Sequence, residues 1–239
     1  MKILLIAGHG AGDSGAVGNG YKEADLAREM LPPLQRALSP YAEVTIFDTS
    51  KNPYEYFKTH SFNFKNYDYV LELHFNAFKK EVESNGKIKG IEILVHPSEK
   101  GVGVENAILN NIVALGFTNR GIKRRSDLQN MNICKGKQGV SYALIETCFI
   151  DDIDDMILYQ SKKEDVINGI ANGIIEGFGL AKNEQNAKTE LTTVNEIVQA
   201  LAEREIITDI ELWNEKLTTD RNAYWLALKC ANHIIKNET

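Results

Sequence analysis

The feature that most constrains this chain is an apolar run near its start that breaks into a glycine-rich segment. Residues Lys2–Ala7 are continuously apolar after the lysine, which is typical of a strand that is buried on both faces. The segment Gly8–Ala16 follows directly and places His9 just beyond the end of that strand. Because ligands of open α/β sheets bind beyond the carboxyl ends of the strands, we expect His9 to face a metal ion or a substrate.

Strand-like and helix-like segments alternate from residue 20 to residue 180. Further apolar runs predict strands at residues 42–47, 67–73, 90–95 and 140–145. Apolar residues at helical spacing predict helices at residues 20–38 and 100–115 and two more between residues 154 and 180. The Pro32-Pro33 pair is expected to bend or interrupt the first helix. This alternation predicts the α/β class, as a three-layer α/β/α arrangement around a mostly parallel sheet.

The last part of the chain differs in composition from the rest. Residues 191–239 contain neither glycine nor proline, and their apolar residues recur at helical spacing, which predicts a small all-α C-terminal domain of three helices. The polar run at residues 182–190 is typical of a linker. We therefore expect a main domain at residues 1–181, which carries the chemistry, and a small helical domain at residues 191–239.

The composition excludes several classes of protein. A formal net charge of -6 argues against a nucleic-acid-binding protein, which needs clustered lysine and arginine. No apolar stretch is long enough for insertion into a membrane, and the first apolar run is too short for a signal peptide. Cys134, Cys148 and Cys230 form no C-x-x-C pair, so neither a disulfide framework nor a cysteine zinc site is indicated. We expect synthesis in a reducing cytoplasm without a signal peptide.

Four residues that can bind a metal or move a proton lie at predicted strand ends or in a helix start. His74 follows the strand at 67–73, Glu146 follows the strand at 140–145, and Glu23 lies in the first turn of the first helix. Two imidazoles and one carboxylate with an open fourth position are the ligand set of a catalytic zinc site, and a further carboxylate can act as a general base. Taken singly, each residue has a simpler explanation, such as a structural histidine or an acidic residue that favours the helix dipole.

Three segments, together with Glu23, resemble the motifs of a known family. The segments are His9–Ala16 (HGAGDSGA), Leu73–Ala77 (LHFNA) and Leu144–Ile150 (LIETCFI). In this order and spacing they resemble the zinc-dependent N-acetylmuramoyl-L-alanine amidases, a family that includes bacterial cell-separation amidases and phage endolysins. Each motif alone is a weak signal, but together they are specific, and the resemblance covers residues 1–180.

The resemblance implies a metal site and a reaction. His9, Glu23 and His74 would bind Zn²⁺, and Glu146 would be the catalytic carboxylate. The reaction would be hydrolysis of the peptidoglycan amide that joins N-acetylmuramic acid to the L-alanine of the stem peptide. The absence of an export signal favours the phage endolysins, whose members are made in the host cytoplasm and act on the cell wall after release.

The sequence departs from the family pattern at two places. Glu72-Leu73 stands where a serine is usual before the second histidine, and Ala7-Gly8-His9 stands where a proline or aspartate neighbour of the histidine is common. Neither change touches a predicted ligand. Two further residues are candidates for contacting the substrate: Asn76, which also has a plausible role in loop architecture, and Arg120, in a basic and amide-rich segment that is otherwise a solvated surface.

Other functions are compatible with the same residues. A zinc peptidase would cut within the stem peptide, and a non-catalytic protein would bind the wall on an amidase scaffold. The presence of all four imidazole and carboxylate positions argues against the second. The C-terminal domain is expected either to bind the wall, with Trp213, Tyr224 and Trp225 as candidate sugar contacts, or to serve as a packing or dimerisation module.

Overall fold

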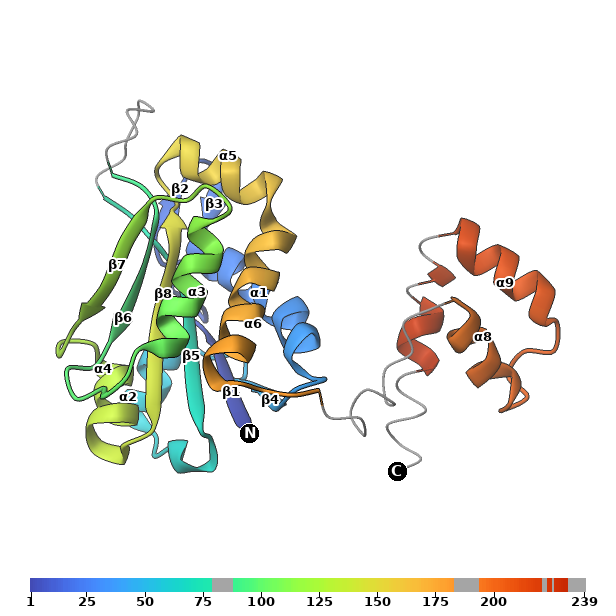
Figure 1. Cartoon of the computed structure of the whole chain (residues 1–239), viewed down its shortest axis with the longest axis horizontal. Coiled ribbons are helices and arrows are strands. Elements are labelled where there is room, and N and C mark those ends of the chain that lie inside the picture. The colour runs from blue at the N-terminus through green and yellow to red at the C-terminus, as the bar shows by residue number, and fades with distance from the viewer. Residues whose placement is uncertain (79–87, 183–193, 221–222, 225, 232–239) are drawn as a thin grey trace. The chain divides into compact units, whose positions relative to one another are not determined.

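The computed structural model describes residues 1–78, 88–182, 194–220, 223–224 and 226–231. The chain divides into two compact units, Met1–Ala181 and Lys182–Thr239 (Figure 1). The linker predicted at residues 182–190 lies outside the described residues, apart from Lys182.

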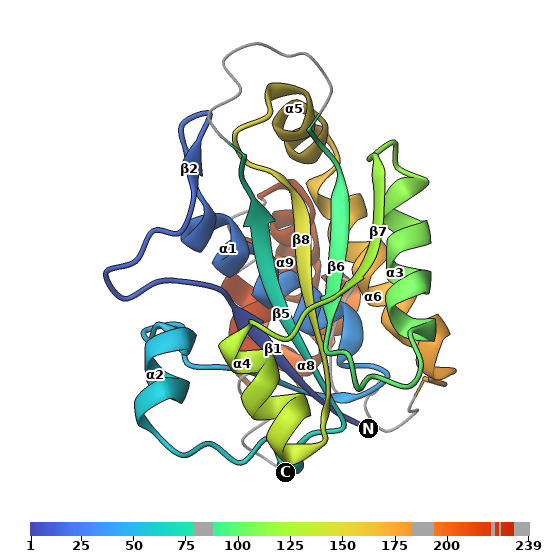
Figure 2. The same ribbon diagram turned by 90° about the vertical axis from the view of Figure 1, so that its left-hand side faces the viewer.

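A six-stranded sheet forms the centre of the first unit (Figure 2). Its strands lie in the order β4 (Glu43–Ile46), β1 (Lys2–Ala7), β5 (Tyr69–Asn76), β8 (Ser141–Phe149), β6 (Ile91–Val95) and β7 (Asn119–Arg124). Neighbouring strands are parallel except for β6 and β8, which are antiparallel. The carboxyl ends of β1, β5 and β8 therefore meet at one edge of the sheet, where ligands of α/β folds bind.

Helices cover both faces of this sheet. One face carries α1 (Glu23–Leu38), α3 (Gly103–Val113), α5 (Ile153–Ser161) and α6 (Lys163–Phe178). The other carries α2 (Pro53–Thr59), the 3₁₀ turn Phe64–Asn66, α4 (Gln129–Met131) and the π-helical turn Asn132–Lys137. A short hairpin of β2 (Val17–Gly18) and β3 (Tyr21–Lys22) lies between β1 and α1 in the chain. This arrangement confirms the predicted three-layer α/β fold with a mostly parallel sheet.

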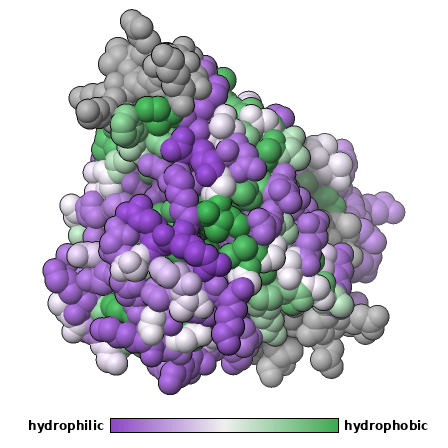
Figure 3. All heavy atoms as spheres, turned by 60° about the vertical axis from the view of Figure 1, so that its left-hand side comes forward, coloured by the Kyte–Doolittle hydropathy of each residue, from purple (hydrophilic) through white to green (hydrophobic). Residues whose placement is uncertain are grey.

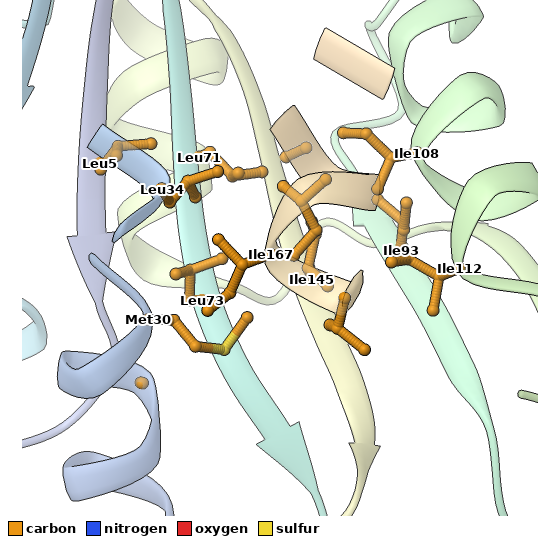
Figure 4. Close-up of a cluster of buried hydrophobic side chains, with 14 of the residues drawn as sticks. Leu5, Met30, Leu34, Leu71, Leu73, Ile93, Ile108, Ile112, Ile145 and Ile167 are labelled. Atoms are coloured by element: carbon orange, nitrogen blue, oxygen red, sulfur yellow. The ribbon is translucent and has the colours of Figure 1, made fainter. Parts of the chain in front are cut away.

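The core of the first face forms where strand side chains meet three helices (Figure 4). Leu73 and Ile145 of the sheet are fully buried in the same cluster as Met30 of α1 and Ile167 of α6. Helices α3 and α6 approach closely because Gly173 has no side chain, and a Cβ there would lie 2.5 Å from the Ile108 backbone. The side of the molecule shown in Figure 3 is mainly hydrophilic, with a smaller apolar area near the middle of the view.

Three features of the first unit differ from the sequence-based expectations. Helix α1 continues through Pro32 and Pro33 instead of being interrupted, because buried Leu31 and Leu34 on either side hold it against the sheet while Pro32 is exposed. Strands β5 and β8 run further than predicted, so His74 and Glu146 lie inside strands rather than after them.

The described residues of the second unit are mostly helical, as predicted. It contains α8 (Val194–Ala202) and α9 (Ile210–Thr219), and residues 223–224 and 226–231 are also helical. Ile197 and Leu201 of α8 pack with Leu217 of α9 in a small apolar core of their own. Asp209 caps the start of α9 by accepting a hydrogen bond from the Leu212 amide at 2.9 Å.

Candidate metal centre

The three predicted metal ligands come together at the carboxyl edge of the sheet. His9 follows β1, Glu23 is the first residue of α1, and His74 lies near the end of β5. One potential ligand atom from each of these residues lies within 4.8 Å of the others. Imidazole nitrogens and a carboxylate oxygen are ligands that Zn²⁺ takes in catalytic sites.

Backbone conformation and missing side chains create the space for this group. His9 has a φ of 60° and Gly10 a φ of 93°, so the chain turns sharply immediately after β1. A Cβ on Gly8 would lie 2.2 Å from Cε1 of His74. A Cβ on Gly15 would lie 2.6 Å from both the Glu23 carboxylate and the His9 ring. These glycines therefore let the rings and the carboxylate meet.

Glu23 bridges the two histidines. Its Oε1 lies 2.8 Å from Nδ1 of His74, and its Oε2 lies 3.1 Å from Nε2 of His9. The amide of Phe75 donates to Oε1 at 3.0 Å, and the amide of Ala16 donates to Oε2 at 2.8 Å. The carboxylate is thus fixed by two backbone donors, and each ring turns one nitrogen toward it.

The other nitrogen of each ring faces a second carboxylate. Nδ1 of His9 lies 2.8 Å from Oδ2 of Asp13, and Nε2 of His74 lies 2.9 Å from Oε1 of Glu72. Metal-binding histidines in proteins commonly have such a carboxylate partner, which orients the ring. The donor set and its surroundings therefore fit a zinc ion.

Without a metal, protons on His9 and His74 offset the negative charge of the carboxylates at this site. Burial opposes the charged form of His74, but its hydrogen bonds to Glu23 and Glu72 raise its pKa well above the usual value. The pKa of His9 is also raised, because contacts with Glu23 outweigh the cost of burial. The pKa of Glu23 is strongly lowered by the two histidines, again against the effect of burial. A metal cation at this position would replace the positive charge of these protons.

Glu146, the predicted catalytic carboxylate, lies beside this group. It is paired in register with His74 of β5 on one side of β8. Its Oε2 is buried and has no hydrogen-bond partner among the described residues. Burial raises the pKa of Glu146 to about 7, with Glu23 and Glu92 adding to the rise and His74 opposing it. A carboxylate with such a pKa is suited to accept and return a proton near neutral pH.

The two predicted substrate contacts, Asn76 and Arg120, both hydrogen-bond to Glu92. Asn76 donates to Oε1 at 3.1 Å, and Nε of Arg120 donates to Oε2 at 2.9 Å. Lys123 also forms an ion pair with Glu92. The Arg120 guanidinium lies 4.7 Å from the centre of the Phe149 ring. These residues therefore lie around Glu92, which is paired with Glu146 across strands β6 and β8.

Arg28 of α1 holds the loops around His9 together. Its guanidinium donates five hydrogen bonds, all to backbone carbonyl oxygens. The acceptors are Gly8, His9, Ala24, Thr49 and Lys51. The loop after β1 is therefore joined to the start of α1 and to the loop after β4.

Sequence reasoning did not place Glu72, Glu92 or Arg28 in this site. A signal for the first two exists, because each is a charged residue with an apolar residue on either side in a predicted strand. A buried charge of this kind needs partners. Arg28 carries no such signal, since an arginine in an amphipathic helix is usually a surface residue.

The comparisons with known proteins agree with the geometry of the site. The model of the N-acetylmuramoyl-L-alanine amidase family matches residues 3–176. The chain belongs to this family. The family is zinc-dependent in general, and His9, Glu23 and His74 form a group that could hold its metal ion.

Several relatives share this amidase region at moderate identity. The chain is 28% identical over 193 residues to autolysin PH of Staphylococcus aureus, a match that covers 74% of the chain but only 38% of the relative. It is 27% identical over 195 residues to the amidase CwlM of Bacillus licheniformis, a match that covers 77% of this chain and 71% of the relative. It is 26% identical over 182 residues to an endolysin of Bacillus phage SPP1, with 74% and 64% covered.

Solved amidase structures have the same fold. The catalytic domain of the CD27L endolysin superposes with a TM-score of 0.58 at 25% identity, covering 74% of this chain and 97% of that domain. The catalytic domain of the amidase CwlV from Bacillus polymyxa superposes with the same TM-score at 22% identity, covering 76% of this chain and 100% of that domain. At 22% identity, the likeness to CwlV concerns the fold alone.

Proposed function

We propose that this protein is a zinc-dependent N-acetylmuramoyl-L-alanine amidase that acts on peptidoglycan. The bond cleaved would be the amide between N-acetylmuramic acid and the L-alanine of the stem peptide. The observation that carries the proposal is the convergence of His9, Glu23 and His74 next to Glu146, a carboxylate with a buried, unpartnered oxygen. Membership of the amidase family supports the same reaction.

The side chains have distinct roles in this proposal. His9, Glu23 and His74 would hold Zn²⁺, which when bound acidifies a water molecule and polarises the amide carbonyl. Glu146 accepts a proton from the attacking water and returns it to the amine of the leaving L-alanine. Burial raises the pKa of Glu146 in the metal-free protein, and the charge of bound Zn²⁺ would lower it again. Asn76 and Arg120 are proposed to contact the substrate on the side of Glu92.

We further propose that the protein acts as an endolysin on the cell wall of a bacterial host. Its similarity to endolysins and to an autolysin supports this role. None of the described helices has the length and apolar character that crossing a bilayer requires. Wall binding by the C-terminal unit stays a prediction. Trp213 packs against the core of that unit, with Nζ of Lys216 5.0 Å from its ring centre, and Trp225 lies outside the described residues.

Mass spectrometry of digested peptidoglycan tests the proposed reaction. Purified cell wall is incubated with the protein with and without a zinc chelator, and the released fragments are analysed. We expect intact stem peptides with a free L-alanine amino group, formed only without chelator. Cleavage within the stem peptide would identify a zinc peptidase instead, and no cleavage of several wall types would favour a wall-binding protein.

A further inference from the structure

Glu72 is a buried carboxylate inside the apolar strand β5. It is 3% exposed and lies two residues before His74. Because strand side chains alternate between the two faces of a sheet, Glu72 and His74 lie on the same face. A buried carboxylate is costly unless it is hydrogen-bonded, so the partners of Glu72 indicate what it does.

Three side chains meet the Glu72 carboxylate. Its Oε1 lies 2.9 Å from Nε2 of His74 and accepts from Nδ2 of Asn130 at 3.2 Å. Its Oε2 accepts from the same Asn130 nitrogen at 3.1 Å and from the hydroxyl of Tyr142. Asn130 lies in α4 and Tyr142 in β8, so elements outside the strand fix the position of the carboxylate.

These contacts place a different carboxylate at each ring nitrogen of His74. Nε2 lies 2.9 Å from Glu72, which is outside the ligand group, whereas Nδ1 lies 2.8 Å from Glu23, which belongs to it. A neutral imidazole has one donor and one acceptor nitrogen. When a metal takes the lone pair of Nδ1 on the Glu23 side, the hydrogen of the neutral ring lies on Nε2, where the Glu72 carboxylate can accept it.

We propose that Glu72 is a positioning residue that holds His74 with its hydrogen on Nε2 and with Nδ1 directed at the metal. This inference rests on the proposed zinc centre. Asn130 and Tyr142 support it by holding the carboxylate, and Gly8 supports it by leaving room for the ring. Outer carboxylates of this kind raise the metal affinity of the histidine that they orient.

Zinc affinity tests the role of Glu72 without relying on activity. Competition with a chromophoric chelator measures the zinc dissociation constant of the wild type, Glu72→Gln and Tyr142→Phe at one pH. We expect Glu72→Gln to weaken zinc binding roughly 10- to 100-fold, because the amide keeps one acceptor oxygen but loses the negative charge that strengthens the hydrogen bond to Nε2. Tyr142→Phe should cause a smaller loss, since Glu72 itself remains.

Glu99→Gln is the matched control for this experiment. Glu99 is also a buried carboxylate, and it accepts from Nζ of Lys135 and from Oγ of Ser141, each at 3.0 Å. Ser141 begins β8, at the end of the strand away from Glu146. The control should therefore bind zinc like the wild type. Zinc binding by Glu72→Gln that equals the wild type would overturn the inference.

A second measurement remains informative if Glu72→Gln does not fold. Long-range ¹H–¹⁵N spectra of the zinc-loaded wild type show which ring nitrogen of His74 carries a hydrogen. We expect the hydrogen on Nε2, and a hydrogen on Nδ1 would contradict the inference. If the wild type binds no zinc, the proposed function and this inference both fail. If the wild type binds zinc and Glu72→Gln binds it equally tightly, the proposed function stands and only the inference about Glu72 fails.

Discussion

Glu92 of β6 lies directly opposite Glu146 of β8 in the only antiparallel pair of the described six-stranded sheet. The two carboxylates have different surroundings. Lys123 and Arg120 lower the pKa of Glu92, although burial opposes this. Among the described residues no lysine or arginine forms an ion pair with Glu146, and burial raises its pKa to about 7 although His74 opposes this. One member of the pair is therefore held as an anion while the other can exchange a proton near neutral pH.

Glu146→Gln should separate catalysis from metal binding. The amide has nearly the same size but cannot accept a proton, so we expect turnover to fall roughly 10²- to 10⁴-fold. Zinc content should stay at the level of the wild type, because Glu146 is not one of the grouped ligands. Muropeptide release and metal analysis measure the two quantities. Full activity of this variant would remove Glu146 from the catalytic role.

The same variant should change how the stability of the metal-free protein depends on pH. The folded-state pKa of Glu146 lies near 7, above its ordinary value of 4.5, so between these values the folded state binds more protons than the unfolded state. The contribution of Glu146 to stability is therefore fully present below pH 4.5 and is lost as pH rises through 7. Glu146→Gln has no such loss. Between pH 4.5 and pH 8, the free energy of unfolding of the variant should therefore rise by about 3 kcal/mol relative to that of the wild type.

Urea denaturation at several pH values, in the presence of a chelator, measures this difference. The gain should grow between pH 4.5 and pH 7 and then level off. A constant difference across this range would show that Glu146 titrates normally in the folded protein.

His74→Ala should abolish stoichiometric zinc binding, because it removes one of the three proposed ligands. His96→Ala is the control, since His96 hydrogen-bonds to Ser98 and lies outside the ligand group. Metal analysis after dialysis compares the two variants. Zinc content equal to that of the wild type in His74→Ala would refute the ligand assignment.

Arg120→Ala should weaken substrate binding more than it slows the chemical step. A hydrogen bond to a charged group contributes about 1.5–3 kcal/mol, so we expect KM for a soluble muropeptide to rise roughly tenfold or more. Arg125→Ala should leave KM unchanged, because Arg125 is engaged with Asp127. An effect on kcat alone would place Arg120 outside the substrate contacts.

The approach of His9, Glu23 and His74 follows from sequence patterns that are visible in the chain. Parallel strands bring their carboxyl ends to one edge, so residues that follow such strands are expected near each other. Family membership is confirmed as well. The zinc-ligand and catalytic roles remain predictions, which the experiments above address.

Other features depend on contacts that a sequence pattern does not contain. An apolar run such as Ile91–Val95 carries no information on strand direction, so the antiparallel pairing that places Glu92 opposite Glu146 was not foreseen. Polar residues were expected to end β5 and β8, yet the pairing of His74 with Glu146 continues the sheet through both. The continuation of α1 through Pro32 depends on the packing of its apolar face.

The five carbonyl contacts of Arg28 also affect how the centre can meet an acidic ligand. A guanidinium has five N–H groups, and in Arg28 the protein itself occupies all of them. Arg120 uses only Nε on Glu92, and its two terminal amino groups have no hydrogen-bond partner among the described residues. The Arg28 guanidinium, on the His9 side, thus has no N–H group left for a ligand. The Arg120 guanidinium, on the Glu146 side, keeps two terminal amino groups that no described residue binds. Under the proposed function, an acidic group of the stem peptide would therefore meet free guanidinium donors at Arg120 of β7.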